Sequence, residues 1–311
     1  MAPAGRRAAA GRHIAPRRAG WGILGAANIA RRALLPAIDA SGNGRIVAMA
    51  SRSPERAIAM LQPYPGVRIL DSYDALLADP EVDVVYNPLP NSLHREWTLR
   101  ALEAGKHVLC EKPIGLNARE AEEMEAAAKG FGKHLMEAFM YRFHPAMREF
   151  VESLAEPLHV QASFGFTATD PQDIRLQPAL GGGALLDVGC YAVSVTHWIL
   201  GEPADLAARA RIANDIDTTV SALLSYAGGA TASVWASVES PEEQDLKVIT
   251  RAGILKRTRP FTAYRDPHDP YQLMVESFAD SVLRDRPVAL PLSESIANMR
   301  VLDQIRAAIR P

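Results

Sequence analysis

The chain has 311 residues, of which 48% are hydrophobic and 23% charged, and its formal net charge is -2. These values are typical of a globular protein with room for two domains. The near-zero charge gives no general attraction for nucleic acid or anionic membranes, so neither is an expected partner. No apolar run approaches the roughly 20 residues of a membrane span. The two cysteines, Cys110 and Cys190, favour a reducing, cytoplasmic location and indicate no metal site.

The first nineteen residues differ in composition from the rest. They contain no acidic residue, many alanines and glycines, and the arginines Arg6, Arg7, Arg12, Arg17 and Arg18. An arginine pair near the start can indicate twin-arginine export, but the apolar stretch of roughly 7–15 residues that such a signal needs does not follow. We expect residues 1–19 to be a disordered basic tail or the product of a misassigned start. An arm that clasps a cofactor or a partner is the alternative.

Short apolar segments alternate with amphipathic, alanine-rich segments as far as Phe139. Strands are predicted at 21–24, 45–50, 67–70, 82–86, 107–110 and 134–138, and helices at 29–39, 73–78, 92–103 and 118–128. Asn117 followed by Glu120 resembles a capping box, and Gly105 is expected to end the preceding helix. Strand–helix alternation at this spacing predicts right-handed βαβ units and a parallel sheet.

The pattern changes after Phe150. Strands of mixed polarity are predicted at 159–167, 206–212, 218–226, 230–238 and 246–250, and helices at 184–200, 271–284 and 294–308. Such a run of strands indicates a mostly antiparallel sheet that is open on one face. The predicted fold class is therefore α/β. A Rossmann dinucleotide-binding domain occupies residues 20–140, and an α+β domain for substrate binding and oligomerisation occupies residues 141–311.

The first predicted strand runs into a turn rich in small residues. Gly25 suits a tight turn, and Ala27 and Ala30 take the second and third small positions of the dinucleotide fingerprint. A pyrophosphate would then lie on the backbone N–H groups of Ala27, Asn28 and Ile29 at the start of the following helix. A tight strand–helix turn without a ligand is the alternative. The position of the turn on the first strand of a βαβ series favours dinucleotide binding.

The end of the second predicted strand bears on the choice of cofactor. NAD-specific sites usually have an acidic residue there, whereas this chain has Ser51, Arg52 and Ser53. Arg52 could pair with a 2′-phosphate or lie over the adenine, with hydrogen bonds from the serines. The alternative is an ordinary exposed arginine at a helix start. We therefore expect NADP, with NAD still possible.

Two further segments carry groups suited to chemistry. Lys112 directly follows a predicted strand, at the sheet edge where α/β proteins bind ligands, and it would act as an acid–base group only with a lowered pKa. Asp187 and Tyr191 follow three glycines at 181–183 that let the backbone pass close to another group, and their spacing places them on one helix face. The alternatives are an exposed loop lysine and an Asp–Tyr pair satisfied within the core.

Five segments, taken in order, resemble the glucose–fructose oxidoreductase / inositol dehydrogenase / MocA-like (Gfo/Idh/MocA) family: 25–30, 87–94, 111–113, 137–145 and 181–191. The likeness runs from Trp21 to the end and is strongest up to Leu200. Tyr191 places the chain nearest the branch of dihydrodiol dehydrogenases, NADP-dependent xylose dehydrogenases and glucose–fructose oxidoreductase. Inositol dehydrogenase-like members have histidine at this position.

The resemblance implies catalytic roles for three residues. Lys112, preceding a cis bond to Pro113, should contact the reacting oxygen and the nicotinamide ribose. Asp187 should orient the substrate and hold Lys112. Tyr191 should be the general acid–base, with its pKa lowered from about 10 by cationic Lys112 and the positive nicotinamide.

The resemblance also implies contacts around these three residues. The loop with Asn87, Pro88, Asn91 and His94 should pass beneath the nicotinamide, with Glu111 and His94 behind the reacting groups. Tyr141, Arg142 and His144 should lie at the domain junction near the substrate mouth. The segment between Phe261 and Tyr271 is shorter than such proteins usually have, which leaves the shape of the sheet and of any dimer open.

The implied function is NADP-dependent hydride transfer at a carbinol carbon of a sugar, such as xylose or glucose, or of a cyclic trans-diol. A homodimer or homotetramer is expected. The first alternative is a non-catalytic, dinucleotide-sensing regulator, which would not need Lys112, Asp187 and Tyr191 together. The second is an enzyme of the same fold that retains its cofactor while two sugars react in turn.

Overall fold

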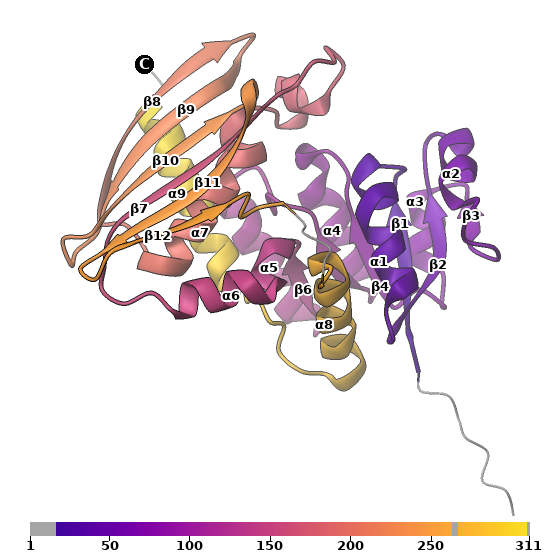
Figure 1. The fold of residues 1–311 in the computed structure, drawn as a ribbon. Coiled ribbons are helices and arrows are strands. Elements are labelled where there is room, and N and C mark those ends of the chain that lie inside the picture. The colour runs from indigo at the N-terminus through magenta and orange to yellow at the C-terminus, as the bar shows by residue number, and fades with distance from the viewer. Residues whose placement is uncertain (1–16, 263–266, 310–311) are drawn as a thin grey trace, which may run out of the picture.

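The computed structural model describes residues 17–262 and 267–309 (Figure 1). Most of the tail predicted at 1–19 lies outside these residues. Within it, Arg17 pairs with Asp83 at 2.6 Å, and the first strand begins at Ala19.

The first half of the chain builds a parallel sheet of six strands, sheet A, with the order β3-β2-β1-β4-β5-β6. The strands are β1 (Ala19–Leu24), β2 (Gly44–Ala50), β3 (Arg68–Leu70), β4 (Val84–Asn87), β5 (His107–Cys110) and β6 (Leu135–Glu137). Each strand predicted in this half is present, with ends displaced by at most two residues. The order reverses between β1 and β4, which is where doubly wound sheets bind ligands.

Helices connect these strands: a π-helical turn (Ala30–Leu34) leading into α1 (Leu35–Ala40), then α2 (Pro54–Leu61), α3 (Tyr73–Ala78), α4 (His94–Glu103) and α5 (Ala118–Phe131). Helix α2 was not predicted, although Ser53 before it and Pro54 at its first position are helix-start signals. Asn117 caps α5 by accepting the N–H of Glu120. The Glu120 carboxylate accepts the N–H of Leu116, so the capping box is only half formed.

The second half builds sheet B, with the order β12-β11-β7-β10-β9-β8. The strands are β7 (Pro157–Thr167), β8 (Asp205–Ala213), β9 (Ile216–Ser225), β10 (Thr231–Ser237), β11 (Glu239–Thr250) and β12 (Ile254–Thr258). β7 and β10 pair in parallel, and the other neighbours are antiparallel. Strand β12 was not predicted because this short edge strand has no buried side chain. The predicted fold class, a Rossmann domain plus an open and mostly antiparallel sheet, is confirmed.

Helices cover one face of sheet B and leave the other open (Figure 1). The covering elements are α7 (Cys190–Leu200), which continues a π-helical turn (Leu185–Gly189), and α9 (Leu292–Ile309). Helix α6 (Pro145–Glu152), not predicted, precedes β7, while α8 (Pro270–Arg284) returns to pack on α1. Along β9 and β10, buried side chains alternate with more exposed ones, and the buried side chains lie on the face that the helices cover.

The segment Pro178–Leu200 is long and apolar enough, by length and composition, to cross a membrane. This differs from the expectation that no segment approaches that length. Within the protein, 72% of its apolar window is buried. The segment therefore forms part of the protein core, where α7 packs on β7, β10 and α9.

Aromatic side chains fill the junction between the two domains. The ring of Tyr191 lies 5.3 Å from that of Phe139, 5.4 Å from Phe164 and 5.5 Å from Phe261. Tyr141 packs behind it at 5.9 Å. This cluster fixes α7 against the end of sheet A, and thereby fixes the position of the residues that α7 carries.

Candidate active site

A groove of about 520 Å³ lies between the carboxyl ends of the sheet A strands and the helix-covered face of sheet B. Of the predicted site residues it is lined by Ile29, Pro88, Asn91, His94, Glu111, Lys112, Asp187 and Tyr191. A larger concavity of about 700 Å³ lies on the open face of sheet B and contains none of the predicted site residues. We therefore place the candidate site in the smaller groove because of the residues that line it, and not because of its volume.

The turn after β1 has the geometry that the dinucleotide fingerprint requires. Gly25 has φ +75° and donates its N–H to the carbonyl of Ala50 at 2.7 Å. A Cβ at Gly25 would lie 3.0 Å from the Leu89 side chain, so the left-handed turn and the close approach both favour glycine. Ala27 and Asn28 precede the π-helical turn, and Ile29 reaches the groove.

Two arginines follow β2 and differ in their surroundings, Arg52 directly after the strand and Arg56 on α2. Arg52 is exposed and lies close enough to the Tyr73 phenol to lower its pKa, although burial of the phenol dominates and raises that pKa overall. The Ser51 hydroxyl accepts the N–H of Ser53 at 3.1 Å. Arg56, which sequence reasoning missed, donates to the carbonyl of Ala26 at 3.0 Å, within the turn after β1. It was missed because helix α2, which carries it, was not predicted.

Hydrogen bonds from the buried side chains of Asn87 and His94 hold the loop after β4 in place. The amide of Asn87 is fully buried and donates to the His94 carbonyl and the Thr98 hydroxyl, both at 3.2 Å. The ring nitrogens of His94 lie 2.8 Å from the carbonyls of Pro113 and Leu89. Burial lowers the pKa of His94 to about 4, so the ring is neutral near pH 7. Asn87 and His94 therefore shape the groove wall.

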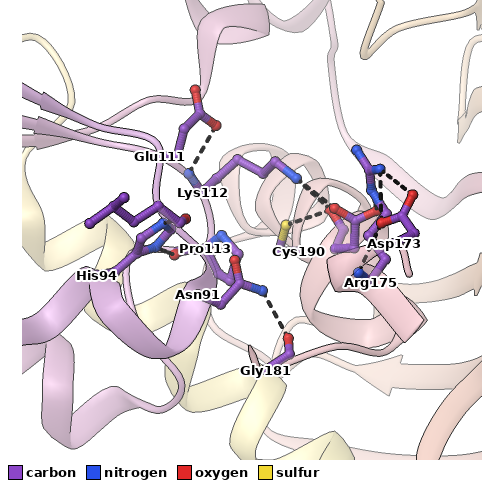
Figure 2. A network of polar contacts seen from close by, with 11 residues as sticks. Asn91, His94, Glu111, Lys112, Pro113, Asp173, Arg175, Gly181 and Cys190 are labelled. Carbon is purple, nitrogen blue, oxygen red and sulfur yellow. Dashed lines mark hydrogen bonds and ion pairs between the residues drawn. The ribbon is translucent and has the colours of Figure 1, made fainter. Parts of the chain in front are cut away.

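Lys112 extends across the groove toward helix α7 (Figure 2). Its Nζ donates to Oδ1 of Asp187 at 3.0 Å and to the carbonyl of the same residue at 2.9 Å. The Lys112–Pro113 bond is cis, as the resemblance implies. Burial alone would lower the pKa of Lys112, but the effects of Asp187, Cys190 and Glu111 together outweigh burial and the pKa is raised. Lys112 is thus a fixed cation and hydrogen-bond donor, and not the lysine of lowered pKa that acid–base work would need.

Asp187 is shared between two cations. Its second oxygen accepts from Nε of Arg175 at 2.9 Å, and Arg175 also pairs with Asp173 at 3.0 Å (Figure 2). Burial would raise the pKa of Asp187, but Lys112 and Arg175 outweigh it and the pKa is lowered. The carboxylate therefore stays ionised and orients both cations. Arg175 belongs to a loop without a periodic pattern, and the sequence analysis did not assign it to the site.

Tyr191 lines the groove beside Lys112, whose Nζ lies 5.1 Å from the centre of the phenol ring. Burial, followed by Tyr271 and Glu111, raises the pKa of Tyr191 well above 10. The lowering expected from Lys112 is not found in the protein alone, because the Lys112 charge is directed to Asp187. The phenol is accordingly a proton donor near neutral pH.

Glu111 and the predicted mouth residues lie around this centre. Glu111 accepts from the Tyr86 hydroxyl at 2.7 Å, and burial raises its pKa. Tyr141 is 1% exposed and bonds to the Ser194 hydroxyl at 2.7 Å, which places it behind Tyr191 and not among the groove-lining residues.

Arg142 is also absent from the groove lining, in contrast to the expected position at the substrate mouth. It pairs with Glu294 at 2.7 Å and lies over the Trp198 ring. His144 caps α6 by accepting the N–H of Ala146. The residues from 140 to 144 therefore support the site from behind.

The chain belongs to the Gfo/Idh/MocA family of oxidoreductases. The family model described as an oxidoreductase family with an NAD-binding Rossmann fold matches residues 19–139. The model for the GFO/IDH/MocA C-terminal domain matches residues 145–256. The predicted family is therefore confirmed, over both halves of the chain.

Individual relatives are similar over most of the chain. D-xylose 1-dehydrogenase (NADP(+)) 2 of Haloferax volcanii is 38% identical over 92% of this chain and 95% of its own. Trans-1,2-dihydrobenzene-1,2-diol dehydrogenase of Mus musculus is 38% identical over 71% of this chain and 68% of its own. The crystal structure of a 3-ketoreductase from Actinomadura kijaniata in complex with NADP and TDP-benzene has a TM-score of 0.89 and 33% identity, covering 94% of this chain and 98% of that one.

Proposed function

We propose that this chain is an NADP-dependent oxidoreductase that transfers a hydride between the nicotinamide and a carbinol carbon of a sugar or diol. The observation that most directly supports this proposal is that Lys112, Asp187 and Tyr191 line one groove at the carboxyl edge of sheet A. The named relatives act on xylose and on a dihydrodiol, which supports a sugar or diol substrate. The comparisons give no support to a non-catalytic regulator.

The residues around the turn after β1 fit NADP. Gly25, with φ +75°, makes the tight turn that a pyrophosphate site needs, and Arg52 after β2 and Arg56 on α2 supply positive charge where a 2′-phosphate would lie. When bound, the nicotinamide supplies or accepts the hydride. Ser51, Ala27, Asn28 and Ile29 would complete this end of the cofactor site.

Three side chains would handle the substrate oxygen. Lys112 stabilises negative charge on that oxygen, because its ammonium group is fixed by Asp187. Tyr191 donates a proton to the oxygen when a carbonyl is reduced, and takes a proton from it when an alcohol is oxidised. Asp187 holds Lys112 and Arg175 in place. The raised pKa of the phenol favours the donor role, so the reductive direction needs no prior ionisation.

The test is reduction of NADP+ and NAD+, followed at 340 nm, with xylose, glucose, inositol and a trans-dihydrodiol. Turnover with NADP+ and an aldose or the diol is the expected result. Tight NADP binding with no turnover on any compound would contradict the proposal and favour the regulator.

Location and assembly belong to the same proposal. We place the enzyme in the cytoplasm because both cysteines, Cys110 and Cys190, are buried free thiols. The open face of sheet B supports assembly as a homodimer or homotetramer, since it carries exposed apolar side chains such as Leu223, and exposed apolar patches mark sites of association. Light scattering coupled to gel filtration would measure the assembly, and a monomer would contradict it.

A further inference from the structure

One wall of the groove comes from sheet B and takes no part in the chemistry proposed above. Phe164 and Phe166 on β7, and Glu242 and Gln244 on β11, all line the groove opposite the Lys112 side. Since successive residues of a strand point to opposite faces, Phe164 and Phe166 occupy one face of β7. The wall therefore has an aromatic row next to a polar row.

An irregularity in β11 places Glu242 at this position. Glu239 is paired with Thr167 and Glu243 with Gly165, so three residues of β11, from Ser240 to Glu242, stand opposite Phe166 alone. The Thr167 hydroxyl holds the bulge by donating to the Ser240 carbonyl at 2.6 Å. Bulges next to active sites commonly redirect a side chain. Beyond the bulge, Gln244 faces the groove directly opposite Phe164.

The polar row offers complementary hydrogen-bonding groups. Oε1 of Gln244 accepts from the Thr262 hydroxyl at 2.8 Å, which turns the amide NH2 into the donor for a ligand. Glu242 is 59% exposed in its side chain, and its ion pair with Arg259 is long, at 3.8 Å. Such an exposed pair contributes little, so the carboxylate can accept from ligand hydroxyls.

The aromatic row is connected to the catalytic residues through Arg175. The guanidinium of Arg175 lies 5.4 Å from the centre of the Phe166 ring while its Nε holds Asp187. A ligand that reaches Lys112 would therefore place one side against phenylalanine and its far end toward Glu242 and Gln244. An apolar C–H face with hydroxyls at its edge fits that wall.

We infer that Glu242 and Gln244 determine substrate specificity by binding the hydroxyls remote from the reacting carbon, so that the substrate is an uncharged polyhydroxylated ring. The inference rests on the proposed function and names its substrate class. A phosphate at the remote end would meet the Glu242 carboxylate and be repelled. A free sugar is therefore accepted and its terminal phosphate ester is rejected.

The test compares Glu242→Gln with Glu243→Gln. Glu243 is a matched control, because it is the next residue, carries the same charge, and points to the open face, where it accepts from the Ser163 hydroxyl. Dissociation constants for D-glucose and D-glucose 6-phosphate are measured on NADPH-loaded protein, in which a sugar cannot be oxidised, and a constant absorbance at 340 nm verifies that the sugar is not reduced either. We expect Glu242→Gln to weaken glucose binding about tenfold and to bring glucose 6-phosphate to within a few-fold of glucose, with no change in Glu243→Gln.

Two results would overturn the inference. One is equal affinity of the unmodified protein for glucose and glucose 6-phosphate. The other is indistinguishable behaviour of the two variants. Because binding is measured without turnover, either result leaves the proposed oxidoreductase function to be decided separately by the 340 nm panel.

Discussion

Lys112 and Tyr191 have different roles in charge stabilisation and proton transfer because their surroundings differ. The Asp187 carboxylate lies 3.0 Å from Nζ of Lys112 and keeps the lysine charged. The Tyr191 phenol, in contrast, is buried, and burial raises its pKa. Charge stabilisation therefore belongs to the lysine and proton transfer to the tyrosine, a division that residue types alone could not establish.

Replacing either residue should abolish most of the activity. Lys112→Ala removes the cation at the substrate oxygen, and Tyr191→Phe removes one hydroxyl, so each should lower kcat by at least about 100-fold.

In the unmodified enzyme, sugar oxidation should accelerate as the pH rises above neutrality, because the raised phenol pKa must be approached before the base forms. Steady-state kinetics from pH 6 to 10, with circular dichroism as the folding control, measure both effects. Near-normal turnover of either variant would refute the assigned roles.

Arg56 should contribute to cofactor choice together with Arg52. Its guanidinium lies at the turn after β1, and a charged hydrogen bond to a phosphate contributes about 1.5–3 kcal/mol. Arg56→Ala and Arg52→Ala should each raise KM for NADP+ by about tenfold or more and affect NAD+ less. Arg45→Ala, at the opposite end of β2, is the control. An equal loss for the two cofactors would exclude a 2′-phosphate contact.

At the scale of elements, the glycines at 181–183 allow segments of the protein to pack closely on one another. A Cβ at Gly181 would lie 2.4 Å from the Leu116 side chain, and one at Gly182 would lie 2.5 Å from the Arg175 carbonyl. The sequence predicted a close approach here, and the structure shows approaches to protein atoms. The three glycines therefore let the loop that carries Arg175 pack closely on the start of the helix that carries Asp187.

Gly183→Ala should damage both stability and activity. Gly183 has φ +118°, and a Cβ there would lie 2.5 Å from Oδ1 of Asp217, whose other oxygen accepts the N–H of Leu185. Backbone strain of this kind costs roughly 1–3 kcal/mol, so the Tm should fall by several degrees and kcat should fall with the displacement of Asp187. Gly228→Ala is the control, because no atom lies within 4 Å of its added Cβ. Equal thermal melts for the two variants would contradict the argument.

Elements with strong periodicity could be predicted, and weakly patterned ones could not. The strands of sheet A and the long helix at 184–200 follow from apolar runs, whereas α2 and α6 are eight-residue helices marked mainly by a proline at the first position. Among site residues, the motifs indicated Lys112 and Tyr191. Arg175 and Glu242 could not be found, because a loop and a bulge bring them to the groove through contacts between distant segments.

At the scale of the whole molecule, the buried carboxyl group of Glu137 lies where the two halves of the chain are in contact. Glu137 at the end of β6 is fully buried and accepts the N–H of Ile114, two residues beyond Lys112. Its other oxygen makes no hydrogen bond of standard geometry within the described part of the chain, although the nearby Ser295 hydroxyl of α9 favours the charged form. Sheet A, α9 and the catalytic segment are therefore joined through one titratable group.

This carboxyl group should make global stability depend on pH. Burial raises the pKa of Glu137 from 4.5 to about 7, so the folded state holds a proton that the unfolded chain releases. The resulting stabilisation is complete below pH 4.5 and is lost as the pH rises through 7. Glu137→Gln keeps an acceptor for Ile114 and cannot ionise, so its Tm relative to the unmodified protein should rise steadily between about pH 5 and pH 8. Thermal melts across this range test the prediction, with Glu243→Gln as a control of equal charge change on the open face. A pH-independent difference would show that Glu137 does not titrate in the folded protein.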